Sequence, residues 1–442
     1  MGFDLTLTLW VLIGGAMILF MHGGFCMLEA GFIRTKTTGT VIMNNLTDFA
    51  ICGIVFWAFG MGFAFNGTSG GFGGWDFVSQ ADYSAILGSQ IPSVGWVLIH
   101  TIFASTVAAI VGGALLERAK FPATLIASTL MSGIVYPIAC SWVWNPSGWL
   151  AQMGIHDFAG GLVLHAFGGI IALIGAIFVG PRIGKYTNGK SNPMPASSLP
   201  LAALGTFMLY FGWYFFNSAI LPAGDADLAS EVASRVFMNN TLAASTATMG
   251  VLFLQWIVEG KPSVSMGINA PLAGLVAVTS CCDAVPLWGG AIIGLAAGLG
   301  MYGSLRLVDE VFHIDDAVGA FAVHCISGTI GMLGCGFFAD GLNSEVGVFF
   351  GGGGHLLGVQ ALGCAAVLAF GAAAMTLVYA VLKFTIGIRA KREEEIAGTD
   401  VAYFGLKETS YPEFLQIEID PAEGMDAPVV KFEDVAKKQV TK

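Results

Sequence analysis

Charged residues are scarce in this sequence. Asp, Glu, Lys and Arg make up 11% of the 442 residues, whereas 55% of the residues are hydrophobic. The mean hydropathy is +0.75, an apolar excess far beyond that of a soluble core, which excludes an ordinary water-soluble domain. The formal net charge is −11 and the sequence has no basic patch, so nucleic acid is not an expected partner.

Motifs for disulfides, metals and catalysis are also missing. The eight cysteines lie inside apolar runs without CxxC spacing, apart from the adjacent pair Cys281 and Cys282. This pattern argues against a disulfide framework or a zinc site. No HExxH sequence occurs either. We therefore expect no metal, no cofactor and no enzymatic activity.

The N-terminal stretch lacks the marks of a secretory leader. From Met1 to about Arg34 there is no cationic n-region and no A-x-A cleavage site. The apolar run is too long for the hydrophobic part of a signal peptide, so it is interpreted as the first membrane span. A cleaved signal is the alternative.

Long apolar runs occur along the chain from residue 5 to residue 387. A membrane-spanning helix needs about 20 apolar residues, and the sequence offers eleven such segments. The sequence therefore predicts an all-α, multi-pass protein of the cell membrane. The segment at 264–281 is the weakest, because Gly267, Asn269, Pro271 and Gly274 interrupt it. The predicted spans are 5–33, 40–65, 93–115, 121–142, 157–180, 199–221, 238–258, 264–281, 287–304, 317–339 and 354–387.

The distribution of positive charge orients these spans. Loops after odd-numbered spans carry nine Lys or Arg residues, whereas loops after even-numbered spans carry only Arg235. By the positive-inside rule the N-terminus lies outside and the C-terminus inside the cell. A miscounted helix would have scrambled this alternation, so it supports eleven spans.

We divide the chain into a membrane domain, residues 1–388, and a charged cytoplasmic tail, residues 389–442. The membrane domain is predicted to hold two inverted repeats of five helices, at about 5–180 and 199–339, and a long eleventh helix at about 354–387. Residues 388–442 contain 8 Lys or Arg and 12 Asp or Glu residues. With three prolines, the last 30 or so residues are expected to be loosely ordered.

The repeat is visible in spans five and ten. Asp157 precedes His165 by eight residues, and Asp316 precedes His324 by the same number, with small residues between them and a Gly four residues after each His. On continuous helices these steps of four share one face, and eight residues rise about 12 Å. Entering from opposite sides of a ~30 Å core, both histidines are expected near its midplane.

The histidines have two possible interpretations. A single His in an apolar helix is commonly a hydrogen-bonded packing residue, but two at symmetry-related positions favour a transport site. A metal-dependent membrane enzyme is a further alternative. It is disfavoured because each acid lies about two turns from its His, too far for shared ligation on one helix.

Several motifs extend this pattern. They are Asp157-Phe-Ala-Gly-Gly with His165, Gly-Ala-Leu-Leu-Glu-Arg at 113–118, Trp144, Gly-Trp-Tyr-Phe-Phe-Asn at 212–217, Asp315 and Asp316 with His324, and Gly-Thr-Asp at 398–400. On these motifs the chain resembles the ammonium transporter (Amt/Mep/Rh) family over about 390 residues, and it is more similar to Amt than to Rh members.

The resemblance implies a homotrimer with one pore in each subunit. Its substrate would be ammonium, with methylammonium as an analogue, deprotonated and conducted as ammonia past the twin histidines His165 and His324, with or without a relayed proton. Phe103 and Phe216 resemble the family's phenyl gate. An alternative is an ammonium sensor or transceptor that signals through the tail. A PII-type regulator would dock on the inner loops and on 389–411.

Residues at the outer mouth are also carried over. Trp144 resembles the tryptophan that attracts the cation, with packing in an interfacial aromatic belt as the alternative, and Asp157 resembles the acid that supports the outer site. The chain differs from the usual pattern at four places, one of them in the tail, where Phe404 and Gly405-Leu-Lys replace a histidine and Gly-Glu. The other three lie at the outer mouth. Ile99 stands where many Amt members have an aromatic residue, His100 replaces a frequent glutamine, and Ile220 replaces a serine whose hydroxyl contacts the cation.

Overall fold

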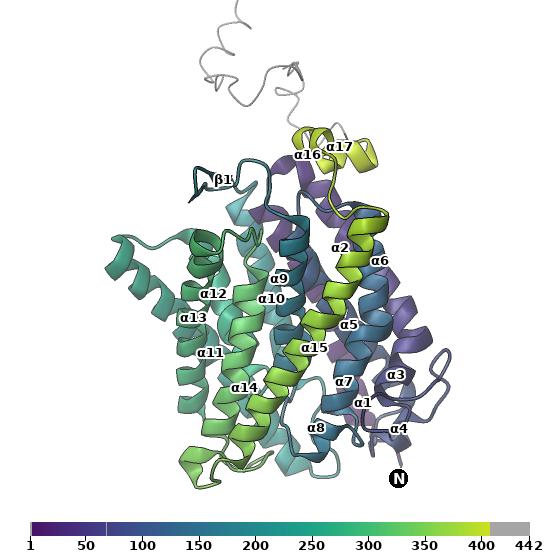
Figure 1. Cartoon of the computed structure of the whole chain (residues 1–442). Helices are drawn as coiled ribbons and strands as arrows, with labels where there is room; N and C mark the ends of the chain where they lie inside the picture. Colours follow the sequence, from purple (N-terminus) through teal and green to yellow (C-terminus); the bar gives the residue numbers. More distant parts are fainter. Residues whose placement is uncertain (1, 68, 407–442) are drawn as a thin grey trace, which may run out of the picture.

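The computed structural model describes residues 2–67 and 69–406. Within these ranges ten helices are long and apolar enough to cross a membrane, and an eleventh apolar helix, α12, is shorter. The helices stand side by side in one bundle, with the N-terminus at one end and the helices α16 and α17 at the other (Figure 1). The prediction of an all-α membrane protein with eleven membrane helices is confirmed. Below, "outer" denotes the end that holds the N-terminus, as the loop charges predict.

The first half of the chain is helical apart from short turns. Three of its spans are continuous with π-helical turns, which are uncommon and often occur at functional sites. The elements are α1 (Leu5–Phe32), η1 (Thr35–Thr37), α2 (Thr38–Val55), η2 (Phe56–Gly60), α3 (Met61–Phe65), α4 (Tyr83–Ile86), α5 (Ser93–Leu115), α6 (Phe121–Leu130), η3 (Met131–Val135), α7 (Tyr136–Trp144), α8 (Trp149–Gln152), η4 (Gly161–Ala166) and α9 (Phe167–Val179).

The second half begins with a two-stranded hairpin and is otherwise helical. Its elements are β1 (Tyr186–Thr187), β2 (Lys190–Ser191), α10 (Leu199–Ser218), α11 (Ala226–Glu259), α12 (Val264–Val278), α13 (Leu287–Arg306), η5 (Leu307–Val311), η6 (Phe321–Ile326), α14 (Ser327–Phe338), η7 (Val348–Phe350), α15 (His355–Thr385), α16 (Arg392–Ala397) and α17 (Thr399–Phe404).

The eighth predicted span, at 264–281, is the one that falls short. Helix α12 has 15 residues and contains Pro271, which removes a backbone donor and is tolerated where neighbouring helices satisfy the freed carbonyl. After α12 the carbonyls of Thr279 and Ser280 accept hydrogen bonds from Ala159 and Phe158. The early end of α12 therefore supplies an anchor for the segment that precedes η4.

Two glycines allow the histidine-bearing helices to approach closely. A Cβ at Gly169 would collide with the backbone of Cys325, and a Cβ at Gly328 would collide with the carbonyl of Gly161. Each glycine lies four residues after a histidine, and each faces the other repeat. Small residues at such crossings let membrane helices pack backbone to backbone.

Buried ion pairs join the inner ends of the helices. Arg182 pairs with Asp315 at 2.8 Å and with Glu117 at 2.7 Å, and Arg34 also contacts Glu117. Burial alone would raise the pKa of Asp315, but hydrogen bonds and charge from Arg182 hold that pKa well below its usual range. These pairs lock the inner loops to one another.

Candidate functional site

The two predicted histidines face each other inside the bundle. Their Nδ1 atoms are 3.2 Å apart, and their rings are stacked with centroids 5.2 Å apart at 16°. His165 is fully buried and His324 is 6% exposed. The structure thus brings together two residues that are 159 positions apart in the sequence, as the repeat predicted.

Each histidine lies on a π-helical turn at the start of its span, not on a continuous α-helix. The expectation of one helix running from Asp157 through His165 is wrong, because the chain is irregular up to Gly160 and the helix begins at Gly161. Gly160 has a φ of 96°, in the left-handed region that only glycine adopts readily. A rise of about 1.5 Å per residue therefore does not apply to the eight residues between Asp157 and His165.

The two aspartates cap these turns. The Asp157 carboxylate accepts hydrogen bonds from the backbone N–H groups of Leu162 and Val163, at 3.0–3.2 Å. Asp316 likewise accepts from the N–H groups of residues 319, 320 and 321, at 2.7–3.1 Å. A carboxylate there satisfies donors that a helix start leaves free. Both aspartates therefore position the histidine-bearing turns.

The hydrogen bond between the histidines limits their protonation pattern. Neither Nδ1 can donate while the other also donates, so one ring carries a proton on Nδ1 and the other accepts it. Nε2 of His165 has no hydrogen-bond partner among the described residues, although it is buried. A buried nitrogen without a partner is costly unless a small molecule contacts it.

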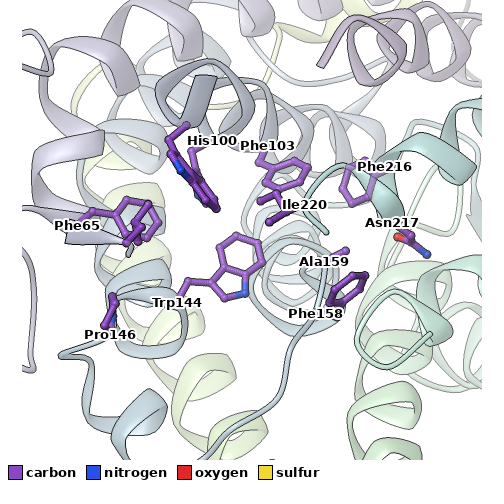
Figure 2. A pocket seen from close by; sticks show the side chains of 12 residues that line it. Phe65, His100, Phe103, Trp144, Pro146, Phe158, Ala159, Phe216, Asn217 and Ile220 are labelled. Carbon is purple, nitrogen blue, oxygen red and sulfur yellow. The ribbon is translucent and has the colours of Figure 1, made fainter. Parts of the chain in front are cut away.

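On the outer side of the histidines lies an aromatic cavity of about 230 Å³. Trp144 lies at its centre, between His100 and Phe65 on one side and Phe103 and Phe216 on the other (Figure 2). Its lining residues are Phe65, Leu87, Trp96, His100, Phe103, Trp144, Pro146, Phe158, Ala159, Phe216, Asn217 and Ile220. Aromatic residues make up much of this lining, and the faces of aromatic rings attract cations.

Two phenyl rings separate the cavity from the histidines. The centroids of Phe103 and Phe216 are 4.9 Å apart, with the rings tilted by 41°. Each side chain is only 1% exposed, and the Phe216 ring also lies 5.5 Å from that of His165. The pair is closed in this structure, so any molecule that passes must move the rings.

Trp144 and Asp157 act on each other through the backbone. The indole N–H of Trp144 donates to the carbonyl of Asp157 at 2.6 Å, which fixes the ring plane in the cavity. The Asp157 carboxylate does not line the cavity, because it is held by the N–H groups of η4. Asp157 therefore positions Trp144 without lining the cavity itself.

The three unusual outer positions differ in where they lie. His100 lines the cavity, stacks on Trp96 with centroids 5.7 Å apart, and has an Nδ1 without a partner among the described residues. Ile220 also lines the cavity. Ile99 is fully buried and is not one of the lining residues, so it does not complete a cage around the cavity.

Sequence reasoning missed several lining residues. Trp96 lies one helical turn before His100 and gives the cavity an aromatic surface, although Ile99 stands where many family members have an aromatic residue. Asn217 lines the cavity with an Oδ1 that has no partner in the described part of the chain, while its amide donates to Asn240 at 2.8 Å. The one-turn spacing of Trp96 from His100 is a signal that could have found it.

A smaller cavity of about 20 Å³ lies on the inner side of His324. Besides His324, its polar lining side chains are Glu29 and Asn269. Glu29 was also missed, although an acid inside an apolar run marks a functional position by default. Polar groups therefore occur on the outer and on the inner side of the histidines.

The fold and this arrangement define a class. Membrane helices surround a closed phenyl pair and two facing histidines, with one cavity on each side. Such a series of sites across the membrane is typical of a channel or transporter.

Comparisons with known proteins agree with this class. The model of the Ammonium Transporter Family matches residues 9–409, so the chain belongs to that family. It is 36% identical to "Ammonium transporter Amt2" of Archaeoglobus fulgidus, over 93% of this chain and 89% of that protein. It is 33% identical to "Putative ammonium transporter sll1017" of Synechocystis, over 90% and 88% of the two chains.

Solved structures show the same fold. The structure named "Sensor Amt Protein" has a TM-score of 0.83 and 32% identity, and the match covers 90% of this chain and 98% of that chain. Mep2 of Candida albicans has a TM-score of 0.82 and 25% identity, with 96% and 95% covered. The protein is a multi-pass cell membrane protein of a transporter family.

Proposed function

We propose that the protein transports ammonium, which it binds in the outer cavity, deprotonates and conducts as ammonia past His165 and His324. The observation that carries this proposal is the stacked histidine pair beneath a closed phenyl pair. Moving a bare ion into hydrocarbon has an idealised cost of order 20 kcal/mol. Neutral ammonia avoids most of that cost, so a route through buried rings suits it.

The outer cavity is the proposed recruitment site. The face of Trp144 attracts the cation by roughly 0.5–2 kcal/mol, and the rings of His100 and Trp96 extend the aromatic surface. Ile220 contributes no hydroxyl, so the aromatic rings carry most of the attraction. Asp157 holds Trp144 in place and adds negative charge at the outer end of η4.

The phenyl pair is the proposed gate. Phe103 and Phe216 exclude water and hydrated ions, because no hydrated ion fits between rings whose centroids are 4.9 Å apart. Below them the unpartnered Nε2 of His165 offers a hydrogen bond to ammonia. The neutral imidazole is favoured there, because a buried charge without a partner is expensive.

Electrical recordings from proteoliposomes on a solid support test this function. His165→Ala and His324→Ala are expected to disrupt the currents that follow an ammonium or methylammonium jump. His22→Gln is the matched control, because His22 is also buried but both of its ring nitrogens have partners, the carbonyl of Ile18 and the hydroxyl of Ser105. Currents of wild-type size and selectivity in both alanine variants would refute the pore assignment.

An ammonium sensor or transceptor is the second candidate. The described part of the tail is docked on the inner loops: Asp400 accepts from the backbone N–H groups of Gly39 and Thr40, and Lys36 donates to the carbonyls of Glu395 and Ile396. A ligand that moved α2 would change these contacts. Tight ammonium binding without flux would favour sensing, and robust flux with an unresponsive tail would favour transport.

The assembly and the division of the chain follow from the same proposal. A homotrimer, a PII-type regulator on the inner loops, and the split into residues 1–388 and 389–442 stay predictions. Most of the tail, 407–442, lies outside the described residues, and so does the expectation that it is loosely ordered. Mass measurement in detergent tests the trimer.

A further inference from the structure

We infer that Glu29 is the acid that returns a proton to ammonia on the inner side of the histidines, and that Asn269 holds the nitrogen while it does so. This inference rests on the proposed function and adds a named proton donor to it. Its basis is a small cavity that Glu29, Asn269 and His324 line together.

The position of Glu29 follows from helix α1. Phe25 lies against His324, with ring centroids 6.3 Å apart, and Glu29 is four residues further along α1. One helical turn carries the side chain about 6 Å towards the inner side on the same face. A carboxyl group thus lies immediately below the histidine pair, on the path that a molecule leaving it would take.

The carboxyl group is held on one side and free on the other. Asn45 donates to Oε2 at 2.8 Å, whereas Oε1 has no hydrogen bond within residues 2–67 and 69–406. Oε1 lies beside Gly113, where a Cβ would be 3.0 Å away. The glycine therefore leaves room for the acid in a tightly packed region.

Glu29 has no positive partner to explain its burial. It is 3% exposed, and none of the ion pairs in the described part of the chain includes it. An acid within a membrane span without a cation is expensive and marks ion or proton pathways. If the role of Glu29 were purely structural, a neutral amide side chain at this position would serve as well and would avoid the cost of a buried charge.

The second observation concerns Asn269. Its side chain is 8% exposed, lines the same cavity, and makes no hydrogen bond with any described residue. Buried amides are almost always hydrogen-bonded. A cavity of about 20 Å³ has room for one small molecule such as water or ammonia, whose nitrogen could accept from the amide of Asn269.

The proposed step is a proton transfer from Glu29 to ammonia. The neutral Glu29 carboxylic acid transfers its proton to the lone pair of ammonia, which gives ammonium and a carboxylate. Ammonium then leaves towards the inner side. The proton that ammonium lost at the outer cavity enters the histidine pair at His165 as His324 passes a proton to the carboxylate, so both imidazoles stay neutral. The net result is one ammonium ion moved, with its charge.

Two quantities measured on the same proteoliposomes test this inference. One is the current after an ammonium jump, and the other is the rise of internal pH that ammonia alone produces, followed with a trapped dye. Glu29→Gln keeps the size of the side chain and the bond from Asn45 but has no proton to give. Asp48→Asn is the matched control, because Asp48 is also a buried acid but bonds Ser128 and lines a different cavity.

In Glu29→Gln the current is expected to fall at least tenfold, since a positioned general acid contributes about 10²–10⁴-fold. The internal pH is expected to rise more than with wild-type protein, because ammonia then takes its proton from the internal solution. Asp48→Asn is expected to leave both the current and the change in internal pH at their wild-type values. Glu29→Asp restores part of the current, and Asn269→Ala, which leaves the acid in place, lowers the ratio of current to pH rise.

The inference would be overturned if Glu29→Gln kept wild-type currents, or if it lost the current and the pH rise equally. It would also be overturned if Asn269→Ala left the ratio of current to pH rise unchanged. Wild-type protein with neither reading would instead refute the proposed function.

Discussion

Replacing Trp144 by leucine tests the outer site. The indole lines the outer cavity and is held by its N–H bond to the carbonyl of Asp157, at 2.6 Å. Leucine removes the ring face but keeps an apolar side chain. The lost cation–π attraction is roughly 0.5–2 kcal/mol, which corresponds to about a 2- to 30-fold weaker binding of the cation.

The measurement is the dependence of the ammonium current on concentration. Trp144→Leu is expected to raise the half-saturating concentration by that factor and to leave the current at saturation nearly unchanged, because the histidines are intact. Trp142→Leu is the matched control: Trp142 lies two residues away, bonds the carbonyl of Gly71 and packs on Trp149, outside the cavity. An unchanged half-saturating concentration in Trp144→Leu, or an equal rise in the control, would refute the reasoning.

Three further predictions concern the gate, the cap and an outer ion pair. Phe216→Ala opens the phenyl pair, so potassium currents that wild-type protein does not conduct are expected; their absence would argue that the rings are only packing. Asp157→Ala removes the cap of η4 and should cost about 0.5–2 kcal/mol, read as a lower Tm in detergent; an unchanged Tm contradicts it. Burial lowers the pKa of His156, but Asp283, 3.0 Å away, raises it more, so the net shift is upward. The ion pair therefore contributes its full stabilisation of the fold below the unfolded pKa of His156, about 6.5. This contribution is lost as the pH rises through the folded pKa of His156. Asp283→Asn should thus lower the Tm more at pH 6 than at pH 9, and an equal loss at both would be the contrary result.

The number of spans and the histidine pair could be predicted from sequence. Both depend on patterns that the chain repeats: apolar runs long enough for a bilayer, and Asp and His at matching distances in two spans. The inverted arrangement adds the antiparallel approach, and the glycines after His165 and His324 make it close. These features are local or symmetric, so the sequence records them directly.

The details of the site depend on irregular backbone, which a periodic pattern does not record. The π-helical turns and the left-handed Gly160 set where His165 points, and they invalidated the simple count along a regular helix. Ile99 was assigned to the outer site although it is fully buried in the core, because a position along a helix does not reveal which face meets a cavity. Glu29 was overlooked because Asn45, which bonds it, and Asn269, which lines the same cavity, come from other helices.

In the proposed function, nitrogen crosses the membrane as ammonia after ammonium gives up a proton. Potassium resembles ammonium in charge and size but has no proton to lose. The most direct measurement is therefore the current of purified wild-type protein after equal jumps of ammonium, methylammonium and potassium. Wild-type protein is expected to give currents with ammonium and methylammonium and none with potassium. A potassium current as large as the ammonium current would show that the ion crosses without losing a proton.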